Sequence, residues 1–160
     1  LLFPLKEHSA VFRIVVPFAF AVIMVLATSA SALNTAEARI YDQISGFGLS
    51  NPVAEWIAEE AARAGVRSIR IANTGGSYGI SSSNGQIKVQ NSPGGRSIRN
   101  LTHEIAHIGA GVRGGHNCAW IRYLTQMALR FEERFGTGGS WGTHSLASYY
   151  PRYGLDGCRS

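Results

Sequence analysis

The segment 101–116, LTHEIAHIGAGVRGGH, carries three histidines and a glutamate at spacings that suit metal chemistry. His103 and His107 are four residues apart, so on a helix their imidazoles project from one face, within reach of a single ion. Zn²⁺ binds two imidazoles well and keeps coordination positions for a third protein ligand and a water molecule. The pair therefore predicts a zinc site on a helix.

Glu104 lies beside this pair and is predicted to be a general base. Zinc lowers the pKa of a bound water molecule towards neutrality. A carboxylate that lies beside the ion without binding it can take a proton from this metal-activated water as it attacks a carbonyl, and can later pass the proton to the leaving amine. A purely structural zinc site needs no such carboxylate, because a fourth protein ligand usually completes its coordination.

His116, nine residues after His107, is predicted to be the third metal ligand. Four glycines between the two histidines give the connecting segment the backbone freedom to turn the imidazole back towards the ion. The metzincin pattern fails, because Ala110 and Arg113 occupy the positions of its glycine and its third histidine.

Other side chains could supply the third ligand instead. A carboxylate from a following helix, Glu132 or Glu133, would match the gluzincin arrangement, although the two glutamates equally suit a solvent-facing position. Cys118 could bind zinc as a thiolate, but it is predicted to form a disulfide with Cys158, the only other cysteine in the chain. An even pair of cysteines in a small exported domain favours a disulfide. The bridge would hold the C-terminal tail beside the helix that follows His116.

This tail, residues 136–157, is aromatic, glycine-rich and irregular in its pattern. Peptide-bond hydrolysis needs a hydrogen-bond donor for the developing oxyanion. His144 and Tyr149 are the first candidates in the tail, and Tyr150 and Tyr153 are further ones. Tyrosines more often contribute buried area to a core, so packing is the alternative role for all three.

Patterns elsewhere in the chain predict the elements that position these residues. Apolar side chains at helical spacing predict a helix capped by Asn51 and ended by Gly65, a second from about Ser97, and a third over 118–135. VRSIRIA at 66–72 and GQIKVQ at 85–90 alternate as strands do. The fold class is therefore predicted to be α+β: a small zincin-like domain whose short antiparallel or mixed sheet packs on the active-site helix and flanking helices.

Residues 86–90 are also the predicted substrate-binding edge. An exposed strand beside a catalytic site can pair with the main chain of an extended peptide and so place the scissile carbonyl. The alternative is an edge that Lys88 protects against pairing.

Residues 1–32 are predicted to be a signal peptide, and residues 33–160 a single domain. An apolar run over 14–27 precedes ATSASA, whose small residues suit cleavage after Ala32. A retained membrane anchor is the alternative, but the run is short for a bilayer crossing and contains Pro17. We therefore expect a secreted or periplasmic protein that meets the membrane only through its export signal.

Composition narrows the class of partner. The formal net charge is +5, but the arginines form no run with interleaved aromatic residues, so no nucleic-acid partner is expected. A length of 160 residues suits one small core. We expect a monomer that acts on a peptide or protein substrate.

Over residues 66–127, the chain resembles the SprT-like zinc metallopeptidases and related minimal zincins. In that family a short sheet precedes the active helix, and an aromatic residue follows the third histidine by four positions. The matching residues are His103, Glu104, His107, His116 and Trp120. Asn117 departs from the pattern, since glycine is usual there, and the export signal departs from the intracellular, DNA-linked role of many members.

The resemblance implies zinc-dependent hydrolysis of peptide bonds. Two alternatives remain open at this stage. The chain could be a cell-wall hydrolase that cuts the amide bonds of peptidoglycan cross-links by the same chemistry, or a secreted zinc-binding module without turnover.

Overall fold

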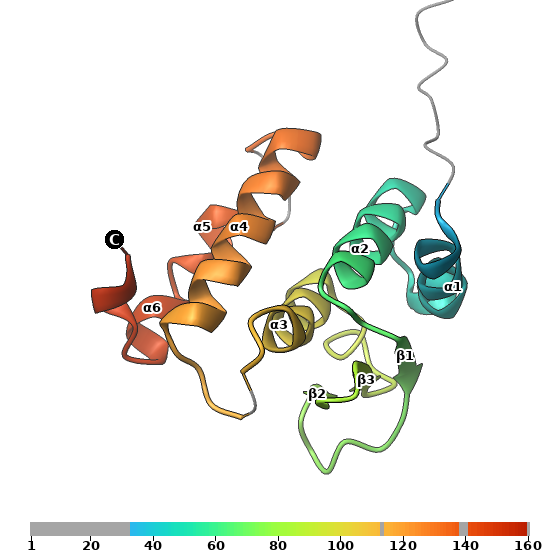
Figure 1. Ribbon diagram of the computed structural model, residues 1–160, viewed down its shortest axis with the longest axis horizontal. Coiled ribbons are helices and arrows are strands. Elements are labelled where there is room, and N and C mark those ends of the chain that lie inside the picture. Colours follow the sequence, from blue (N-terminus) through green and yellow to red (C-terminus); the bar gives the residue numbers. More distant parts are fainter. Residues whose placement is uncertain (1–32, 113, 138–140, 160) are drawn as a thin grey trace, which may run out of the picture. The chain divides into compact units, whose positions relative to one another are not determined.

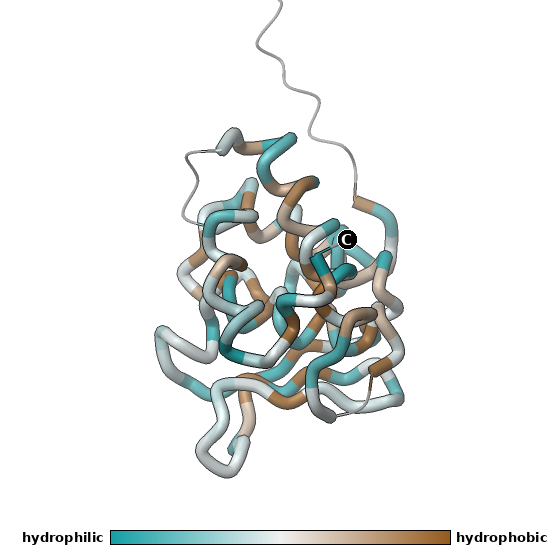
Figure 2. Tube along the Cα trace, turned by 90° about the vertical axis from the view of Figure 1, so that its left-hand side faces the viewer, coloured by the Kyte–Doolittle hydropathy of each residue, from teal (hydrophilic) through white to brown (hydrophobic). Residues whose placement is uncertain are grey.

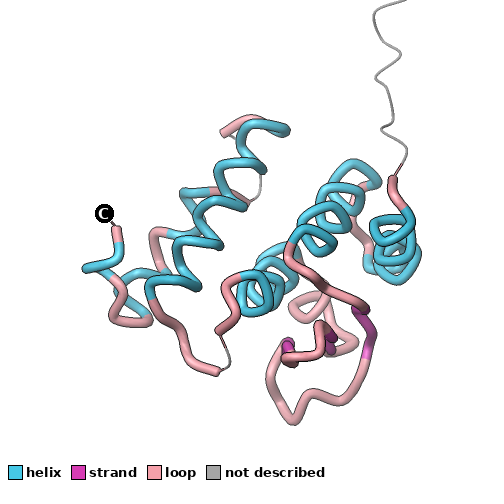
Figure 3. Tube along the Cα trace, in the orientation of Figure 1, coloured by secondary structure: helices cyan, strands magenta, loops and turns pink. Residues whose placement is uncertain are grey.

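The computed structural model describes residues 33–112, 114–137 and 141–159. The predicted signal peptide, residues 1–32, lies outside these described residues. Within them, long helices alternate with loops (Figure 1), and the strands are short segments set among the loops (Figure 3). The elements in chain order are α1 (Thr35–Ile44), η1 (Ser45–Phe47), α2 (Asn51–Arg63), β1 (Ser68–Ile71), β2 (Gly79–Ser81), β3 (Gln86–Val89), α3 (Ile98–Gly109), α4 (Cys118–Phe135), α5 (Thr143–Leu146), α6 (Tyr149–Arg152) and η2 (Asp156–Cys158).

A short mixed sheet packs against these helices, which confirms the predicted α+β class. Its order is β1-β3-β2, with β3 parallel to β1 and antiparallel to β2. The prediction that residues 86–90 form an edge was therefore wrong, because β3 has a neighbour on both sides. Ile87 and Val89 of β3 are fully buried, as befits a central strand. The strand at the edge beside α3 is β2, in a segment that the sequence pattern indicated only as a turn.

The predicted helices are present with small changes at their ends. Ser50 occupies the cap position of α2 and Asn51 is its first helical residue, so the helix begins one position earlier than predicted. The sequence pattern gave no sign of α1, which begins with a capping box in which Asn34 and Glu37 bond reciprocally to each other's backbone N–H groups. The helix lies against α2 and β1. Two fully buried isoleucines, Ile40 and Ile44, join it to the core.

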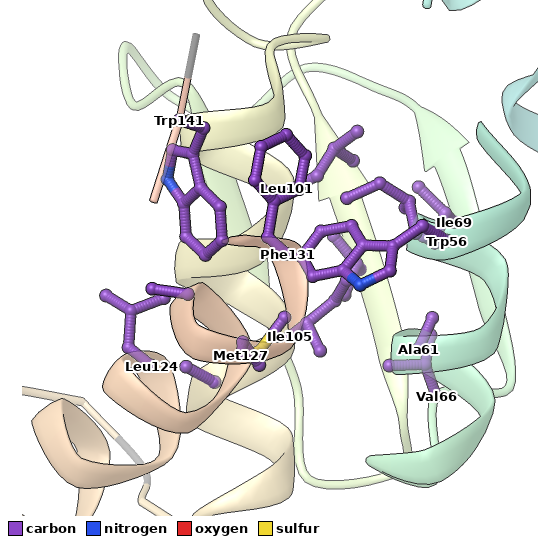
Figure 4. Packing of buried hydrophobic residues seen from close by; sticks show 14 of the residues in the cluster. Trp56, Ala61, Val66, Ile69, Leu101, Ile105, Leu124, Met127, Phe131 and Trp141 are labelled. Atoms are coloured by element: carbon purple, nitrogen blue, oxygen red, sulfur yellow. The ribbon is translucent and has the colours of Figure 1, made fainter. Parts of the chain in front are cut away.

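Apolar side chains from α2, α3, α4 and the sheet form one core. Figure 2 shows apolar and polar segments alternating along the helices, as expected of helices that bury one face. Figure 4 shows Trp56 of α2 packed with Phe131 of α4 and Trp141, whose ring centroids lie 5.1 and 5.6 Å from that of Trp56. Leu101 and Ile105 of α3 are fully buried in the same cluster. The buried face of α3 is thus fixed, which leaves its other face free for the site.

A buried ion pair also links α2 to α4. Glu60 is 2% exposed and accepts two hydrogen bonds of 2.7 Å from the guanidinium of Arg130. This bidentate geometry satisfies both carboxylate oxygens, so the charge of Glu60 is compensated inside the core. The pair fixes the position of α4 along α2.

The predicted disulfide between Cys118 and Cys158 is present. It joins the first residue of α4 to the last residue of η2 and holds this part of the tail beside that helix, as expected. None of the helices in the described residues combines the length and the apolar character that a bilayer crossing requires.

Removal of this bridge is expected to destabilise the protein strongly. The Cys118→Ser, Cys158→Ser double variant should lose about 3 to 4 kcal/mol of unfolding free energy, because the bridge closes a sequence separation of 40 residues and so restricts the unfolded chain. Guanidinium chloride unfolding of both proteins measures the difference. A loss below about 1 kcal/mol would contradict this account of the tail.

Candidate functional site

His103 and His107 lie on one side of α3, where both rings contact Trp120 of α4. Ser97 caps the helix by accepting a hydrogen bond from the backbone N–H of Asn100. One turn separates the two histidines, and their ring centroids are 5.0 Å apart. Both side chains are partly buried. Helical spacing has therefore placed the pair side by side, as predicted.

The turn after α3 returns the chain to this pair. Gly111, Gly114 and Gly115 have φ values of 66°, 64° and 70°, a left-handed conformation that side chains disfavour. Asn117 then caps α4 by accepting from the backbone N–H of Trp120 at 3.0 Å. This cap explains an asparagine where the resembled family usually has glycine. His116, between the turn and the cap, is carried back to α3.

The three histidines form a cluster that could hold a metal ion. Nε2 of His116 lies 3.0 Å from Nε2 of His103, and one ring nitrogen from each of the three residues lies within 4.8 Å of the other two. Two nitrogens on one tetrahedral zinc ion would lie about 3.3 Å apart. The buried Nδ1 of His107 has no hydrogen-bond partner among the described residues. The donor set and its spacing therefore fit a divalent ion.

The surroundings keep these imidazoles uncharged. Burial, the other two imidazoles and the guanidinium groups of Arg152 and Arg99 lower the pKa of His103 to about 3. Burial, His107 and Arg152 lower the pKa of His116 to about 4. Burial also lowers the pKa of His107. All three rings are thus neutral at pH 7, which is the form that binds metal ions.

Aromatic side chains support the cluster from α4 and the tail. Trp120 is fully buried, and its ring centroid lies 4.9, 5.5 and 4.3 Å from those of His103, His107 and His116. Its indole N–H donates to the backbone carbonyl of His103 at 3.3 Å. Tyr153 stacks on His116 with a centroid distance of 3.8 Å. These aromatic contacts hold the three imidazoles in place without adding a charged group to the cluster.

Glu104 lies beside the cluster but faces β2 instead of the imidazoles. The side chain is 5% exposed. Burial raises the pKa of its carboxyl, and polar contacts from the side chain and backbone of Ser81 partly offset that rise. A Cβ atom on Gly79 would lie 2.9 Å from Glu104 Oε1, so only glycine leaves room for the carboxylate. A buried carboxylate with a raised pKa is a good proton acceptor.

The alternative metal ligands lie elsewhere. Glu132 accepts hydrogen bonds from the backbone and hydroxyl of Thr143 at 2.8 and 2.7 Å, and Glu133 is exposed on α4. Cys118 is in the disulfide. None of these three joins the histidine cluster within the part of the chain that the structure describes.

The tail residues predicted to assist catalysis divide into two groups. Tyr149 and Tyr153 line a cavity of about 510 Å³ that also borders His103 and Glu104. His144 is exposed on α5, outside the lining of that cavity. The hydroxyl of Tyr150 lies 3.1 Å from that of Thr125, on the side of α4. Of the four, the fold brings only Tyr149 and Tyr153 to the histidines.

Sequence reasoning missed two arginines of this cavity, Arg99 and Arg152. A helical signal was present, because Arg99 precedes His103 by four residues and so shares its face. Arg152 gave no such signal, because the disulfide and the folding of the C-terminal tail, not its spacing from the histidines, bring it to the site.

No family model, curated protein or solved structure matches this chain. The interpretation of the site therefore depends on the residues of this chain and their geometry.

Metal binding is the direct test of the cluster. The protein is expected to bind one divalent ion per chain, and His116→Ala should weaken that binding by at least about 100-fold, since loss of a ligand costs no less than loss of its supporting partner. Elemental analysis and competition with a chromogenic chelator measure stoichiometry and affinity. His144→Ala is the matched control, because this exposed histidine lies outside the cluster. Equal affinities in the two variants would remove His116 from the site.

Proposed function

We propose that the protein is an extracytoplasmic zinc metallopeptidase. The observation that carries the proposal is a buried carboxylate, Glu104, beside three clustered neutral imidazoles but turned away from them. Three nitrogen ligands and a site open to a cavity are typical of catalytic zinc, whereas structural zinc sites are closed by a fourth protein ligand. The disulfide supports an oxidising compartment.

His103, His107 and His116 would hold the zinc ion. When bound, zinc supplies Lewis-acid chemistry, polarising a carbonyl and making water more acidic. The imidazoles contribute neutral nitrogen donors that leave the positive charge of the ion uncompensated, which strengthens this effect. Trp120 and Tyr153 keep the three rings from separating.

Glu104 is the proton carrier in this proposal. One carboxylate oxygen accepts a proton from the attacking water, and the same oxygen donates it to the leaving nitrogen. Burial favours the protonated carboxyl, which donates the proton to the leaving nitrogen. Polar contacts from Ser81 favour the ionised carboxylate, which accepts the proton from water. The two effects adjust the carboxyl for transfer in both directions.

The free edge of β2 supplies the main-chain partner for an extended peptide. The backbone carbonyl of Tyr78 accepts from Gln90, and the N–H of Ser82 donates to Gln86, so these two residues are bonded to β3. Backbone groups alternate along an antiparallel strand, so those of Gly79, between them, point to the free edge. A peptide paired there lies next to Glu104. This edge replaces residues 86–90 as the proposed substrate strand.

Tyr149 is the proposed donor to the developing oxyanion. Its hydroxyl oxygen accepts a hydrogen bond of 3.0 Å from Nε of Arg99, which leaves its own proton free to donate. Burial raises the pKa of this phenol, so the proton is retained at neutral pH. Its ring lies 6.0 Å from that of His103. A substrate oxygen in the cavity between them would meet this proton.

Replacement of the base separates hydrolysis from metal binding. Glu104→Gln should keep the bound metal and lower kcat for a protein substrate such as casein by about 10³-fold, because an amide cannot accept the proton. Turnover and metal content are measured on the same preparation. Glu133→Gln, an exposed glutamate on α4, is the matched control and should retain full activity. Activity of Glu104→Gln within a few-fold of the parent would exclude Glu104 as the base.

A methyl group on β2 tests whether the position of the carboxylate matters. Gly79→Ala places a Cβ atom 2.8 Å from Cγ of Glu104 and 2.8 Å from Nδ2 of Asn100, so the carboxylate must move. We expect kcat to fall by about 100-fold, whereas the overpacking should cost only about 1 to 3 kcal/mol of unfolding free energy and leave the protein folded. Gly46→Ala, where nothing lies within 4 Å, should change neither quantity. Unaltered turnover in Gly79→Ala would contradict the role of β2.

A further inference from the structure

We propose that Arg99 and Arg152 form a carboxylate-binding subsite for the part of the substrate on the C-terminal side of the scissile bond. The proposal rests on the peptidase function and adds a substrate class to it: peptides with a carboxylate shortly after the cleaved amide.

Both guanidinium groups line the cavity that borders His103 and Glu104. The guanidinium carbon of Arg99 lies 4.8 Å from the ring centroid of Tyr149, and its NH2 group donates to the hydroxyl of Ser148 at 3.3 Å. Arg152 lies over the ring of Tyr153, 5.4 Å from its centroid. Stacking on rings that also contact the histidines fixes both cations at the entrance to the site.

Neither cation has an acidic partner in the part of the chain that the structure describes. Every ion pair within the described residues involves another arginine: Arg63, Arg130, Arg134 or Arg159. Among the described residues that line this cavity, Glu104 is the only carboxylate, and it faces β2. Two uncompensated guanidinium groups in one cavity select an anion. A guanidinium group can donate two parallel hydrogen bonds to the two oxygens of one carboxylate. A carboxylate is therefore the anion that fits these groups best.

The position of the cavity along β2 gives the direction of the substrate. It is lined by Ser77, Tyr78 and Gly79, at the start of β2. A second cavity of about 320 Å³, lined by Ser81, Ser82, Ser83 and His107, lies at the other end and contains no arginine or lysine among its described lining residues. A peptide that pairs antiparallel to β2 runs from the second cavity to the first. Its C-terminal portion therefore reaches the arginines.

A free C-terminal carboxylate and an aspartate or glutamate side chain present the same chemistry, and a peptide library distinguishes these two sources. Random hexapeptides are offered to the full-length protein with either a free or an amidated C-terminus, and the products are sequenced by mass spectrometry. We expect carboxylates on the C-terminal side of the cleaved bond to be enriched at least about tenfold.

Loss of cleavage on amidation identifies the terminal carboxylate as the source. Enrichment of Asp and Glu in the amidated library identifies the side chain. Equal cleavage of all classes would overturn the subsite.

Arg152 is the sharper position for mutation, because Arg99 also holds the hydroxyl of Tyr149. Arg152→Gln should raise KM for the preferred acidic peptide by about tenfold, leave its kcat within about twofold, and abolish the preference over the amidated or neutral peptide. Arg39→Gln removes the same charge from an exposed position on α1 and is the control. A preference that survives in Arg152→Gln would overturn the proposal, and so would an equal KM change in Arg39→Gln.

A binding measurement separates this proposal from the peptidase function. Fluorescein-labelled hexapeptides with free or amidated C-termini are titrated with the Glu104→Gln protein, and the affinity is measured by fluorescence anisotropy. Tighter binding of the free acid that disappears on Arg152→Gln supports the subsite even if the parent protein hydrolyses no peptide, a result that would reject only the peptidase function. Hydrolysis without any dependence on Arg152, in binding or in KM, would reject only the subsite.

Discussion

The packing of Trp120 against three imidazoles is the contact on which the site depends. His103 and His107 belong to α3, whereas His116 lies just before Asn117, the cap of α4, so the cluster exists only while the two helices keep their relative position. The buried indole touches all three rings and donates to the backbone of α3. The disulfide at Cys118 holds the same end of α4 to the tail. The packing of Trp120 and the disulfide therefore both stabilise the region where the three histidines meet.

Electrostatics around the cluster impose a second constraint. A cation held by neutral imidazoles near Arg99 and Arg152 is repelled by both guanidinium groups, and in a partly buried site this repulsion is only weakly screened. The same two arginines lower the pKa of His103. Glu104 offsets part of the positive charge, and an anionic substrate would offset more. A net positive cavity therefore favours acidic ligands over basic ones, which is a form of selectivity that does not depend on shape.

The sequence predicted the parts of the site whose geometry is local, and missed the parts that tertiary contacts create. Helical spacing predicted that His103 and His107 would lie together, and the glycine-rich turn predicted the return of His116. The edge strand was placed wrongly because β3, with its clear alternation, is central, whereas β2 has only three residues and two of them are small. Arg152 reaches the cavity through folding of the tail, a non-local event that no periodicity records.

Short β2 also decides what Glu104 can do. On α3, Asn100 and Glu104 lie on a face next to the one that carries His103 and His107. The helix alone would therefore leave the carboxylate free to turn towards the imidazoles. Close approach of Gly79 and polar contacts from Ser81 hold it on the strand side instead. A carboxylate that rotated onto the imidazoles would occupy the position that water needs, and the site would close as a structural one. The element with the weakest sequence signal therefore keeps the proposed base apart from the proposed ligands.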